Sequence, residues 1–325
     1  MKQLRTVSGK GFLFLAFMAL ILFSGSALAA NDGDVTDYPF VCRATGWHVE
    51  APSFTTKPLF TIWGSSPRDI FVIAGQGAIY HYDGTGWTKM ITGSAMNVYT
   101  LWGTSPNNVF AAGYNNMVYR YNGTSWKKMV TPTLANSLFG LWGSSSSSIF
   151  AVGDFGTILR YNGTSWKKMT SGTSKRLFSV WGSSSKNVLA TGEDGLIIRY
   201  DGLAWKKMNP GTTKRSYAIW GSSASDVFAV GESGSIIHYN GTSWTQMNSG
   251  TTNYLNGVWG SSSSDVYAVG EMGTILHYDG KSWTKMASGI SKELWWVWGS
   301  SGHVFAVGAA GKLLHQAPAT ATETW

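Results

Sequence analysis

Cysteine is almost absent from this chain: Cys42 is the only one among 325 residues. No intrachain disulfide can form, so packing must hold the fold together. Only one long apolar run occurs, residues 11–23, and it is shorter than the roughly 20 residues that span a bilayer. The sequence also lacks the motifs of zinc proteases, nucleophile elbows, phosphate-binding loops and dinucleotide-binding folds, so these enzyme classes have no support.

The chain begins with the features of an export signal. Three basic residues precede the apolar run, and the small residues Ala27 and Ala29 follow it. We therefore expect residues 1–29 to be a signal peptide, with the remainder exported to the periplasm or the extracellular space and free of transmembrane spans. Removing the three positive charges of the signal from a formal charge of +8 leaves +5, which favours anionic partners without naming one. Residues 30–37 and 317–325 lack apolar periodicity and are expected to be flexible.

A Trp-Gly dipeptide recurs through the rest of the chain at intervals of 39 or 40 residues. Its tryptophans are Trp63, Trp102, Trp142, Trp181, Trp220, Trp259 and Trp298. A second tryptophan series keeps step with the first but begins before it, at Trp47, Trp87, Trp126, Trp166, Trp205, Trp244 and Trp283. Regular units of this length are typical of repeat folds such as propellers.

One unit, residues 255–286, divides into four short apolar runs that turn residues separate. The runs 255–259, 266–269, 274–278 and 283–286 are predicted strands. An Asp-Gly or Asn-Gly pair after the third run supplies the positive φ of a tight hairpin into the fourth. These pairs begin at Asp83, Asn122, Asn162, Asp201, Asn240 and Asp279.

Four antiparallel strands in each of seven units predict an all-β, seven-bladed β-propeller over residues 38–316. The last unit stops after its third strand at His315, whereas a spare fourth strand around Trp47 precedes the first unit. We therefore expect the N-terminal strand to complete the last blade as its outer strand. This arrangement closes the ring and removes exposed sheet edges.

The repeat WGSSxxDVFAVGxxGxIxHYDGxSWxxM resembles the repeats of secreted bacterial β-propellers. It is remotely similar to the photosystem II assembly-factor, sialidase-type and kelch propellers. The repeat lacks the Gly-Gly pair of kelch units and the Asp-box of sialidases, so the resemblance carries no enzymatic activity to this chain. It implies a binding scaffold, and the fold alone does not choose the ligand.

Two polar positions twelve residues apart recur in every unit, one before the second strand and one in the third. The pairs are Asp69/His81, Asn108/Arg120, Ser148/Arg160, Asn187/Arg199, Asp226/His238, Asp265/His277 and His303/His315. Histidine goes with aspartate in three pairs, arginine goes with a neutral partner in three, and the last pair has two histidines. We expect a hydrogen bond that ties the third strand to the first turn, similar to the Asp–His network of WD-repeat propellers.

The closing blade breaks this rule because His303 stands where an acid is expected. The hairpin register would place His48 opposite His315, and the three imidazoles could then bind a transition metal. The sequence offers them no evident acidic partner, and unpaired surface histidines are common. We therefore expect neither a metal nor another cofactor.

Two series of residues are candidate ligand contacts at the mouth where the inner strands begin. The aromatic side chains, followed by the acids of the loops between strands two and three, are Phe60, Tyr99, Phe139, Phe178, Tyr217, Trp295, Trp296, Asp154, Glu193, Glu232 and Glu271. Aromatic planes beside carboxylates suit sugar binding. The alternative is that the aromatic residues pack between blades and the acids are solvated.

Basic residues gather on the predicted outer strands of three consecutive blades and in the links that follow. They are Lys127, Lys128, Lys167, Lys168, Lys206, Lys207, Lys175, Arg176, Lys214 and Arg215. Such a patch could dock an acidic polysaccharide or an acidic protein face, while nucleic acid is not expected after export. The alternative is that lysines on outer strands block edge-to-edge association.

These observations favour a secreted, non-catalytic recognition or assembly scaffold that binds a protein or an envelope polymer through one propeller face. The mouth that bears Trp295 and Trp296 is the expected contact surface, and we expect a monomer. A multivalent carbohydrate-binding lectin is the first alternative. A glycosidase-like or lyase-like propeller enzyme is the second, and it would need an acid and a base from the loop acids.

Overall fold

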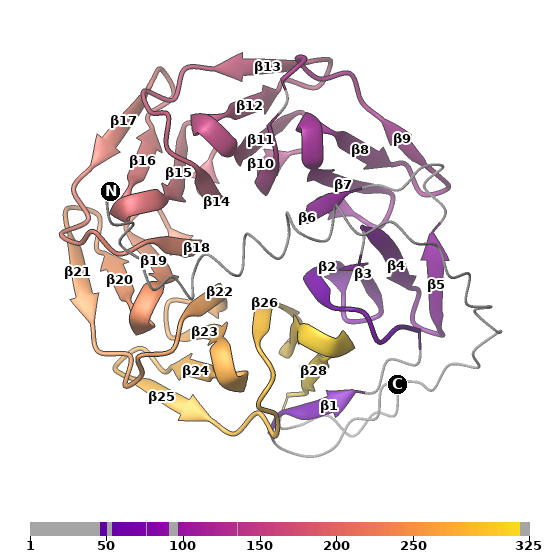
Figure 1. Cartoon of the computed structure of the whole chain (residues 1–325), viewed down its shortest axis with the longest axis vertical. Coiled ribbons are helices and arrows are strands. Elements are labelled where there is room, and N and C mark those ends of the chain that lie inside the picture. The colour runs from indigo at the N-terminus through magenta and orange to yellow at the C-terminus, as the bar shows by residue number, and fades with distance from the viewer. Residues whose placement is uncertain (1–45, 51–53, 76, 91–96, 135, 319–325) are drawn as a thin grey trace, which may run out of the picture. The chain divides into compact units, whose positions relative to one another are not determined.

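Seven four-stranded antiparallel sheets make up the fold, and each is one blade of a β-propeller (Figure 1). The structure is a computed structural model that describes residues 46–50, 54–75, 77–90, 97–134 and 136–318. All of these residues belong to one compact unit, Thr36–Trp325. The expected signal peptide, the segment 30–37 and the tail beyond residue 318 lie outside the described residues. In the described part of the chain, no helix has the length and apolar character needed to cross a membrane.

The inner and second strands of each blade form a tight hairpin. The inner strands are β2 (Leu59–Ser66), β6 (Val98–Ser105), β10 (Leu138–Ser145), β14 (Leu177–Ser184), β18 (Ser216–Ser223), β22 (Leu255–Ser262) and β26 (Leu294–Ser300). The second strands are β3 (Asp69–Ala74), β7 (Asn108–Gly113), β11 (Ser148–Gly153), β15 (Asn187–Gly192), β19 (Asp226–Gly231), β23 (Asp265–Gly270) and β27 (His303–Gly308).

The third and outer strands form the second hairpin of the blade. The third strands are β4 (Ala78–Tyr82), β8 (Val118–Tyr121), β12 (Ile158–Tyr161), β16 (Ile197–Tyr200), β20 (Ile236–Tyr239), β24 (Ile275–Tyr278) and β28 (Leu313–Gln316). The outer strands are β5 (Trp87–Met90), β9 (Trp126–Lys128), β13 (Trp166–Met169), β17 (Trp205–Met208), β21 (Trp244–Met247), β25 (Trp283–Met286) and β1 (His48–Glu50). The predicted four-strand unit is confirmed, although inner strand β22 runs on to Ser262 because that residue still pairs with Asp265.

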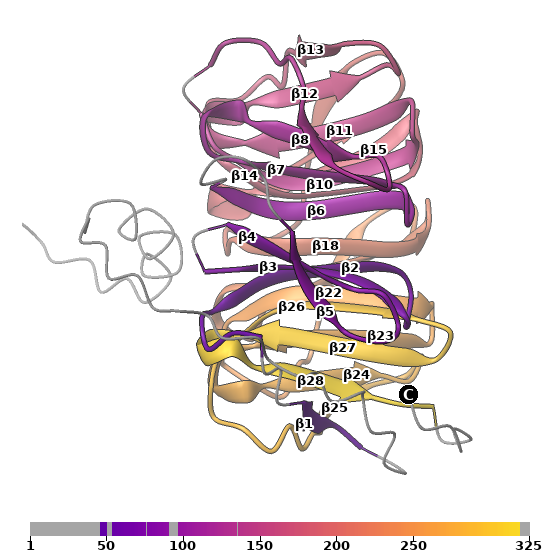
Figure 2. The ribbon, with the colours of Figure 1, turned by 90° about the vertical axis from the view of Figure 1, so that its right-hand side faces the viewer.

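The N-terminal strand completes the last blade, as predicted. The sheet order is β1-β28-β27-β26, and β1 pairs with β28 in the register that places His48 opposite His315. Trp47, just before β1, is buried: its Nε1 donates a hydrogen bond to Met286 Sδ at 3.4 Å, and its ring meets Tyr267 edge-on at 6.0 Å. The seam therefore also holds blade 7 against blade 6. In the side view of Figure 2, β1 lies beside β28.

The Trp-Gly dipeptide is the joint between neighbouring blades. The indole of each tryptophan lies on the glycine of the next blade, so that a Cβ added at Gly103 would fall 2.5 Å from Cη2 of Trp63. The same contact recurs at every junction and closes the ring from Trp298 to Gly64, where the distance would be 2.7 Å. Any side chain at these glycines would push the blades apart, because protein interiors are close-packed.

The second strands form the core of each blade. Five of them carry a phenylalanine that is at most 1% exposed: Phe71, Phe110, Phe150, Phe228 and Phe305. The next blade covers this ring with its hairpin aromatics; Phe71, for example, meets Tyr121 edge-on at 5.7 Å and Trp126 at 6.3 Å. Each aromatic-rich repeat therefore completes the core of its neighbour, as a propeller requires.

Candidate binding surfaces

Each blade has two ends, and the candidate residues lie at one or the other. One end carries the start of the inner strand and a short 3-10 turn between the second and third strands. We call the surface formed by these turns the η face. The turns are η1 (Tyr114–Asn116), η2 (Asp154–Gly156), η3 (Glu193–Gly195), η4 (Glu232–Gly234), η5 (Glu271–Gly273) and η6 (Ala309–Gly311). The opposite end, the hairpin face, carries the Trp-Gly turns and the Asp-Gly or Asn-Gly hairpins.

Two bulky apolar side chains stand exposed on the η face. The middle residue of every η turn has a left-handed backbone with φ between 52 and 56°. Phe155 is 69% exposed at this position and Met272 is 65% exposed. Bulky residues are uncommon in the left-handed region, and strain of this kind clusters at functional sites. The sequence reasoning missed both residues; their signal was an apolar residue between a loop acid and a glycine.

The four loop acids begin the turns η2 to η5, and their carboxylates hold the backbone. Each accepts a hydrogen bond from the amide that precedes the inner strand of its own blade. The bonds run from the amides of Ser137, Arg176, Arg215 and Tyr254 to Asp154, Glu193, Glu232 and Glu271, at 3.2, 3.2, 3.0 and 3.1 Å. These acids are half-buried, and each is hydrogen-bonded to the backbone. They are therefore not the solvated acids that one of the two interpretations of the sequence describes.

Asp154 also belongs to an aromatic and basic cluster that joins blades 2, 3 and 4. Arg176 Nε donates a hydrogen bond to Asp154 Oδ1 at 2.6 Å, and its guanidinium lies 5.3 Å from the centre of the Phe139 ring. Phe139 in turn stacks on Tyr99 at 5.9 Å. Burial, assisted by Tyr114 and Asp154, raises the pKa of Tyr99 to about 12. Because the charges of Arg176 and Asp154 offset each other, the cluster presents aromatic rings and no net charge, which suits contact with a protein surface.

Most of the mouth aromatics pack between neighbouring blades. Phe60 stacks on Trp295 at 5.2 Å, and Phe178 meets Tyr217 edge-on at 5.4 Å. All four of these side chains are at most 9% exposed. Trp296 is partly exposed and packs against the core between blades 7 and 1. The aromatic rings are therefore part of the inter-blade packing, with limited surface left for a ligand.

Glu293 is a half-buried acid that the sequence reasoning did not single out. It precedes β26, at the position that Arg176 and Arg215 occupy before their own inner strands. Asn256 Nδ2 donates a hydrogen bond to Glu293 Oε1 at 3.0 Å, across the junction of blades 6 and 7. Burial raises the pKa of Glu293. The signal in the sequence was its position directly before the first residue of an inner strand.

Six of the seven predicted polar pairs are hydrogen-bonded. The distances are 2.7 Å in Asp69/His81, 2.7 Å in Asn108/Arg120, 2.6 Å in Asn187/Arg199, 2.7 Å in Asp226/His238, 2.8 Å in Asp265/His277 and 2.9 Å in His303/His315. The exception is Ser148/Arg160, because the short serine side chain leaves the guanidinium free to reach Tyr200 of the next blade at 3.2 Å. Where the repeat also has a serine, as at Ser65, its hydroxyl donates to the aspartate and not to the histidine. A serine nucleophile must donate its proton to a histidine, so this arrangement does not activate the serine.

The histidines of the closing blade contact one another and an acid, and they are not arranged around a common point. His303 Nδ1 lies 2.9 Å from His315 Nε2, which is a hydrogen-bond distance, and Nδ1 of His315 lies 3.6 Å from Glu50 Oε1. Glu50 on β1 is an acidic neighbour that the sequence reasoning did not foresee. Burial and the nearby His315 lower the pKa of His303 to about 4. Among the described residues, including His48, no group of three or more possible ligands could hold a metal ion.

The basic residues divide between two surfaces. The lysine pairs of β9, β13 and β17 are exposed. In each of these three blades the first lysine of the pair lies opposite an arginine of the third strand: Arg120 opposite Lys127, Arg160 opposite Lys167 and Arg199 opposite Lys206. By contrast, Arg176 and Arg215 form ion pairs with acids of the η face, Asp154 and Glu232. Lys175 pairs with Asp194 at 3.2 Å, Lys206 pairs with Asp201 at 2.7 Å, and the exposed Lys214 lies in the link before Arg215. The uncompensated charge is therefore concentrated on the outer strands of blades 2 and 3.

The comparisons with known proteins support the fold. No model of a protein family matches the chain, and no curated protein matches it either. Similar solved structures include YCF48 from Cyanidioschyzon merolae, 18% identical, with a TM-score of 0.70 over 85% of this chain and 100% of that one. A structure of YCF48 bound to D1 peptide is 14% identical, with a TM-score of 0.70 over 86% and 99%. An inactive virginiamycin B lyase from Staphylococcus aureus with quinupristin is 13% identical, with a TM-score of 0.74 over 83% and 98%. At these identities the likeness establishes a propeller fold and leaves the activity open.

Proposed function

We propose that this chain is an exported, non-catalytic scaffold that binds a protein partner through its η face. The observation that carries the proposal is the pair of exposed apolar residues, Phe155 and Met272, held in left-handed backbone at the tips of η2 and η5. Neither residue contributes its side chain to the core. A small or polar residue would suit the same backbone better, so an external contact accounts for the two bulky side chains at these positions.

The surroundings of Phe155 support the same proposal. Arg176 and Tyr99 lie in the cluster beside it, and Tyr114 at the start of η1 is 36% exposed. Aromatic residues and arginine are enriched among the few residues that contribute most of the energy of protein–protein interfaces. Arg176 is already fixed by Asp154, so little side-chain entropy is lost when a partner binds.

The engaged loop acids support a non-catalytic role. A general acid and base must reach a substrate proton. In the acids of η2 to η5, by contrast, at least one carboxylate oxygen accepts a hydrogen bond from the backbone of the same blade. The similar propellers illustrate both outcomes: one was solved with a bound peptide and another is a lyase. The side chains, and not the fold, must therefore decide the function.

The proposal is tested by affinity capture from the native cell envelope or culture medium, using matched variants. The double variant Phe155→Ser and Met272→Ser removes the apolar contacts, and Ser233 already occupies the same backbone conformation in η4. The control is Leu203→Thr, which removes an apolar side chain that is 91% exposed on the hairpin face, where other blades have threonine. We expect proteins retained by the wild type and the control to be lost from the double variant. Equal retention by all three would contradict an η-face interface.

The carbohydrate and enzyme alternatives have their own tests. Retention of glycans on an array, abolished by Trp296→Ala in a variant that still folds, would favour a lectin. Single changes of Glu193, Glu232 or Glu271 to glutamine are expected to leave any measured activity unchanged. Loss of activity from one position alone would show that this acid is catalytic and would overturn the non-catalytic proposal.

A further inference from the structure

The link from blade 2 to blade 3 differs from the other links and leaves a groove. In η2 to η6 the third residue is glycine, and a Cβ at Gly156 would collide with Thr173 O of the following link. The equivalent residue of η1 is Asn116, with φ 53°. Its side chain takes the place in which Thr173 O packs in blade 3, so the link 129–134 follows a different path and encloses a groove with Asn115 and Met117. This link also contains the extra residue of the single 40-residue interval.

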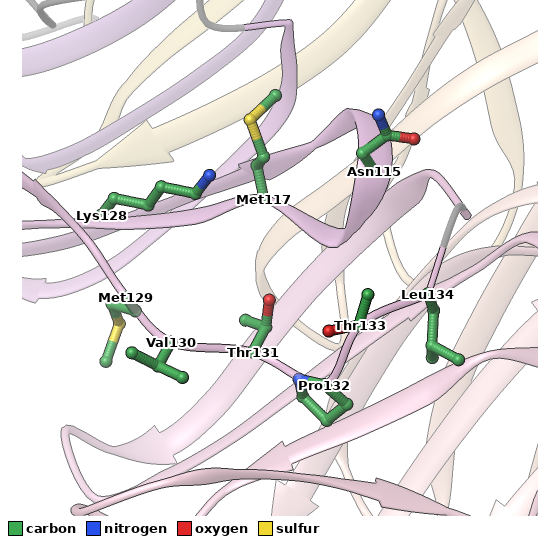
Figure 3. Close-up of a pocket in the computed structure, with 9 residues that line it drawn as sticks. All are labelled: Asn115, Met117, Lys128, Met129, Val130, Thr131, Pro132, Thr133 and Leu134. Atoms are coloured by element: carbon green, nitrogen blue, oxygen red, sulfur yellow. The ribbon is translucent and has the colours of Figure 1, made fainter.

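The groove between this link and blade 2 has a volume of about 540 Å³ (Figure 3). Figure 3 shows the side chains of the link along one side and those of Asn115, Met117 and Lys128 along the other. Five of its nine lining residues are apolar, namely Met117, Met129, Val130, Pro132 and Leu134, and Val130 is 91% exposed. An open groove with this lining can take one apolar side chain of a partner.

Hydrogen bonds hold the groove in its open form. Thr131 Oγ1 donates to Asn116 O at 2.9 Å, and Asn116 Nδ2 donates to Leu134 O at 3.1 Å. The amide of Asn116 also donates to Asn136 O at 2.7 Å. Both ends of the link are therefore tied to η1. A site that is already formed loses less entropy when it binds a ligand.

The segment of the chain that contains the groove is rich in basic residues. Residues 97–176 contain eight lysines and arginines but only one acid, Asp154, which pairs with Arg176. Lys128 lines the groove itself, and no lining residue is acidic. On the same outer strand, Lys127 lies directly opposite Arg120.

We propose that the groove binds a short acidic segment of a protein partner, with one apolar side chain of the segment in the groove and its carboxylates against Lys128 and the neighbouring basic outer strand. Apolar walls and flanking lysines together match a peptide that alternates apolar and acidic residues. A purely anionic polymer has no group for the apolar lining. This inference rests on the proposed function because it assumes a protein partner, and it adds a second contact surface to the η face.

The test uses the mature protein and fluorescence anisotropy of a short labelled peptide in which glutamates flank one central leucine. We expect binding that weakens about tenfold when the leucine is replaced by serine, since one buried apolar side chain contributes that much. The variants Lys128→Glu and Val130→Asp should weaken binding to a similar extent. Both positions are exposed, and circular dichroism with a melting curve verifies that the variants are folded.

The matched control is Lys285→Glu, at the register position of Lys128 on β25 in blade 6. It changes the net charge equally but lies far from the groove in the ring, so binding should stay within about twofold of the wild type. No binding to the wild type, equal binding of the serine peptide, or equal weakening by the control would overturn the proposal. These results concern a defined peptide, whereas the η-face proposal depends on capture by the wild type and its Phe155 and Met272 variant. The two proposals can therefore fail separately.

Discussion

The histidine pair of the closing blade should make the fold sensitive to mild acid. His303 is 4% exposed, and burial followed by the charge of His315 lowers its pKa from 6.5 to about 4. The ring of Phe305 stacks on His315 at 4.4 Å, and Glu50 Oε1 lies 3.6 Å from Nδ1 of His315.

The sign of the effect follows from the direction of this shift. Because the pKa of His303 is lower in the folded state, the unfolded chain takes up the proton first as the pH falls. The contribution of the neutral His303 ring to the free energy of unfolding is complete above pH 6.5. It is lost progressively as the pH falls toward 4. At about 1.4 kcal/mol for each unit of pKa, the loss reaches about 3 kcal/mol. That is a large part of the stability of an ordinary domain.

The repeat supplies the variant that tests this reasoning. His303→Asp installs in blade 7 the pair that Asp265 and His277 form in blade 6. Urea unfolding followed by tryptophan fluorescence between pH 7.5 and 4.5 should show the variant gaining about 2–3 kcal/mol on the wild type as the pH falls. The reciprocal change, Asp265→His, should make the protein more sensitive to acid. A difference between variant and wild type that does not change with pH would refute the assignment of the effect to His303.

Three further predictions concern stability and are measured by urea or thermal unfolding. Trp47→Ala should destabilise the fold by about 3–5 kcal/mol, because it removes a buried indole from the seam; an effect below about 1 kcal/mol would mean that the seam is not cooperative with the ring. Gly221→Ala places a Cβ 2.6 Å from Asp226 O and against the indole of the previous blade, and should cost about 1–3 kcal/mol, whereas Ser233→Ala on an exposed turn should be neutral. Glu232→Ala should cost about 1–2 kcal/mol through the lost bond to the backbone, with glutamine restoring most of it; a neutral alanine variant would contradict the structural role of the loop acids.

The ring and its seam were predictable because their signals are local in sequence. Trp-Gly and Asp-Gly or Asn-Gly recur at fixed spacing, and strand alternation between them specifies four strands per unit. The unpaired third strand at His315 and the early Trp47 are visible without coordinates. The register that joins His48 to His315 follows from the hairpins of the complete units. Only the outcome at Ser148 departed from the expected pairing, because a serine is too short to hold Arg160.

The candidate surfaces were less predictable because they depend on contacts between residues of different elements. The role of the loop acids depends on amides seventeen residues earlier, which come close only after the hairpin has formed. The exposure of Phe155 depends on the sign of φ in η2, and composition does not reveal this. The groove depends on one asparagine, Asn116, at a position where the η turns of five other blades have glycine. Aligning the units against one another would have shown both Phe155 and Asn116 as departures.

The pairing of Trp with Gly has a consequence for how such a protein can grow. The residue that projects and the residue that receives it are adjacent in the chain, yet each makes its contact with a different neighbour. A single 39-residue segment copied in tandem would thus arrive with matched surfaces on both sides, and no compensating mutation would be required at either border. What limits the number of copies is then the angle between successive segments, and not their ability to adhere to one another.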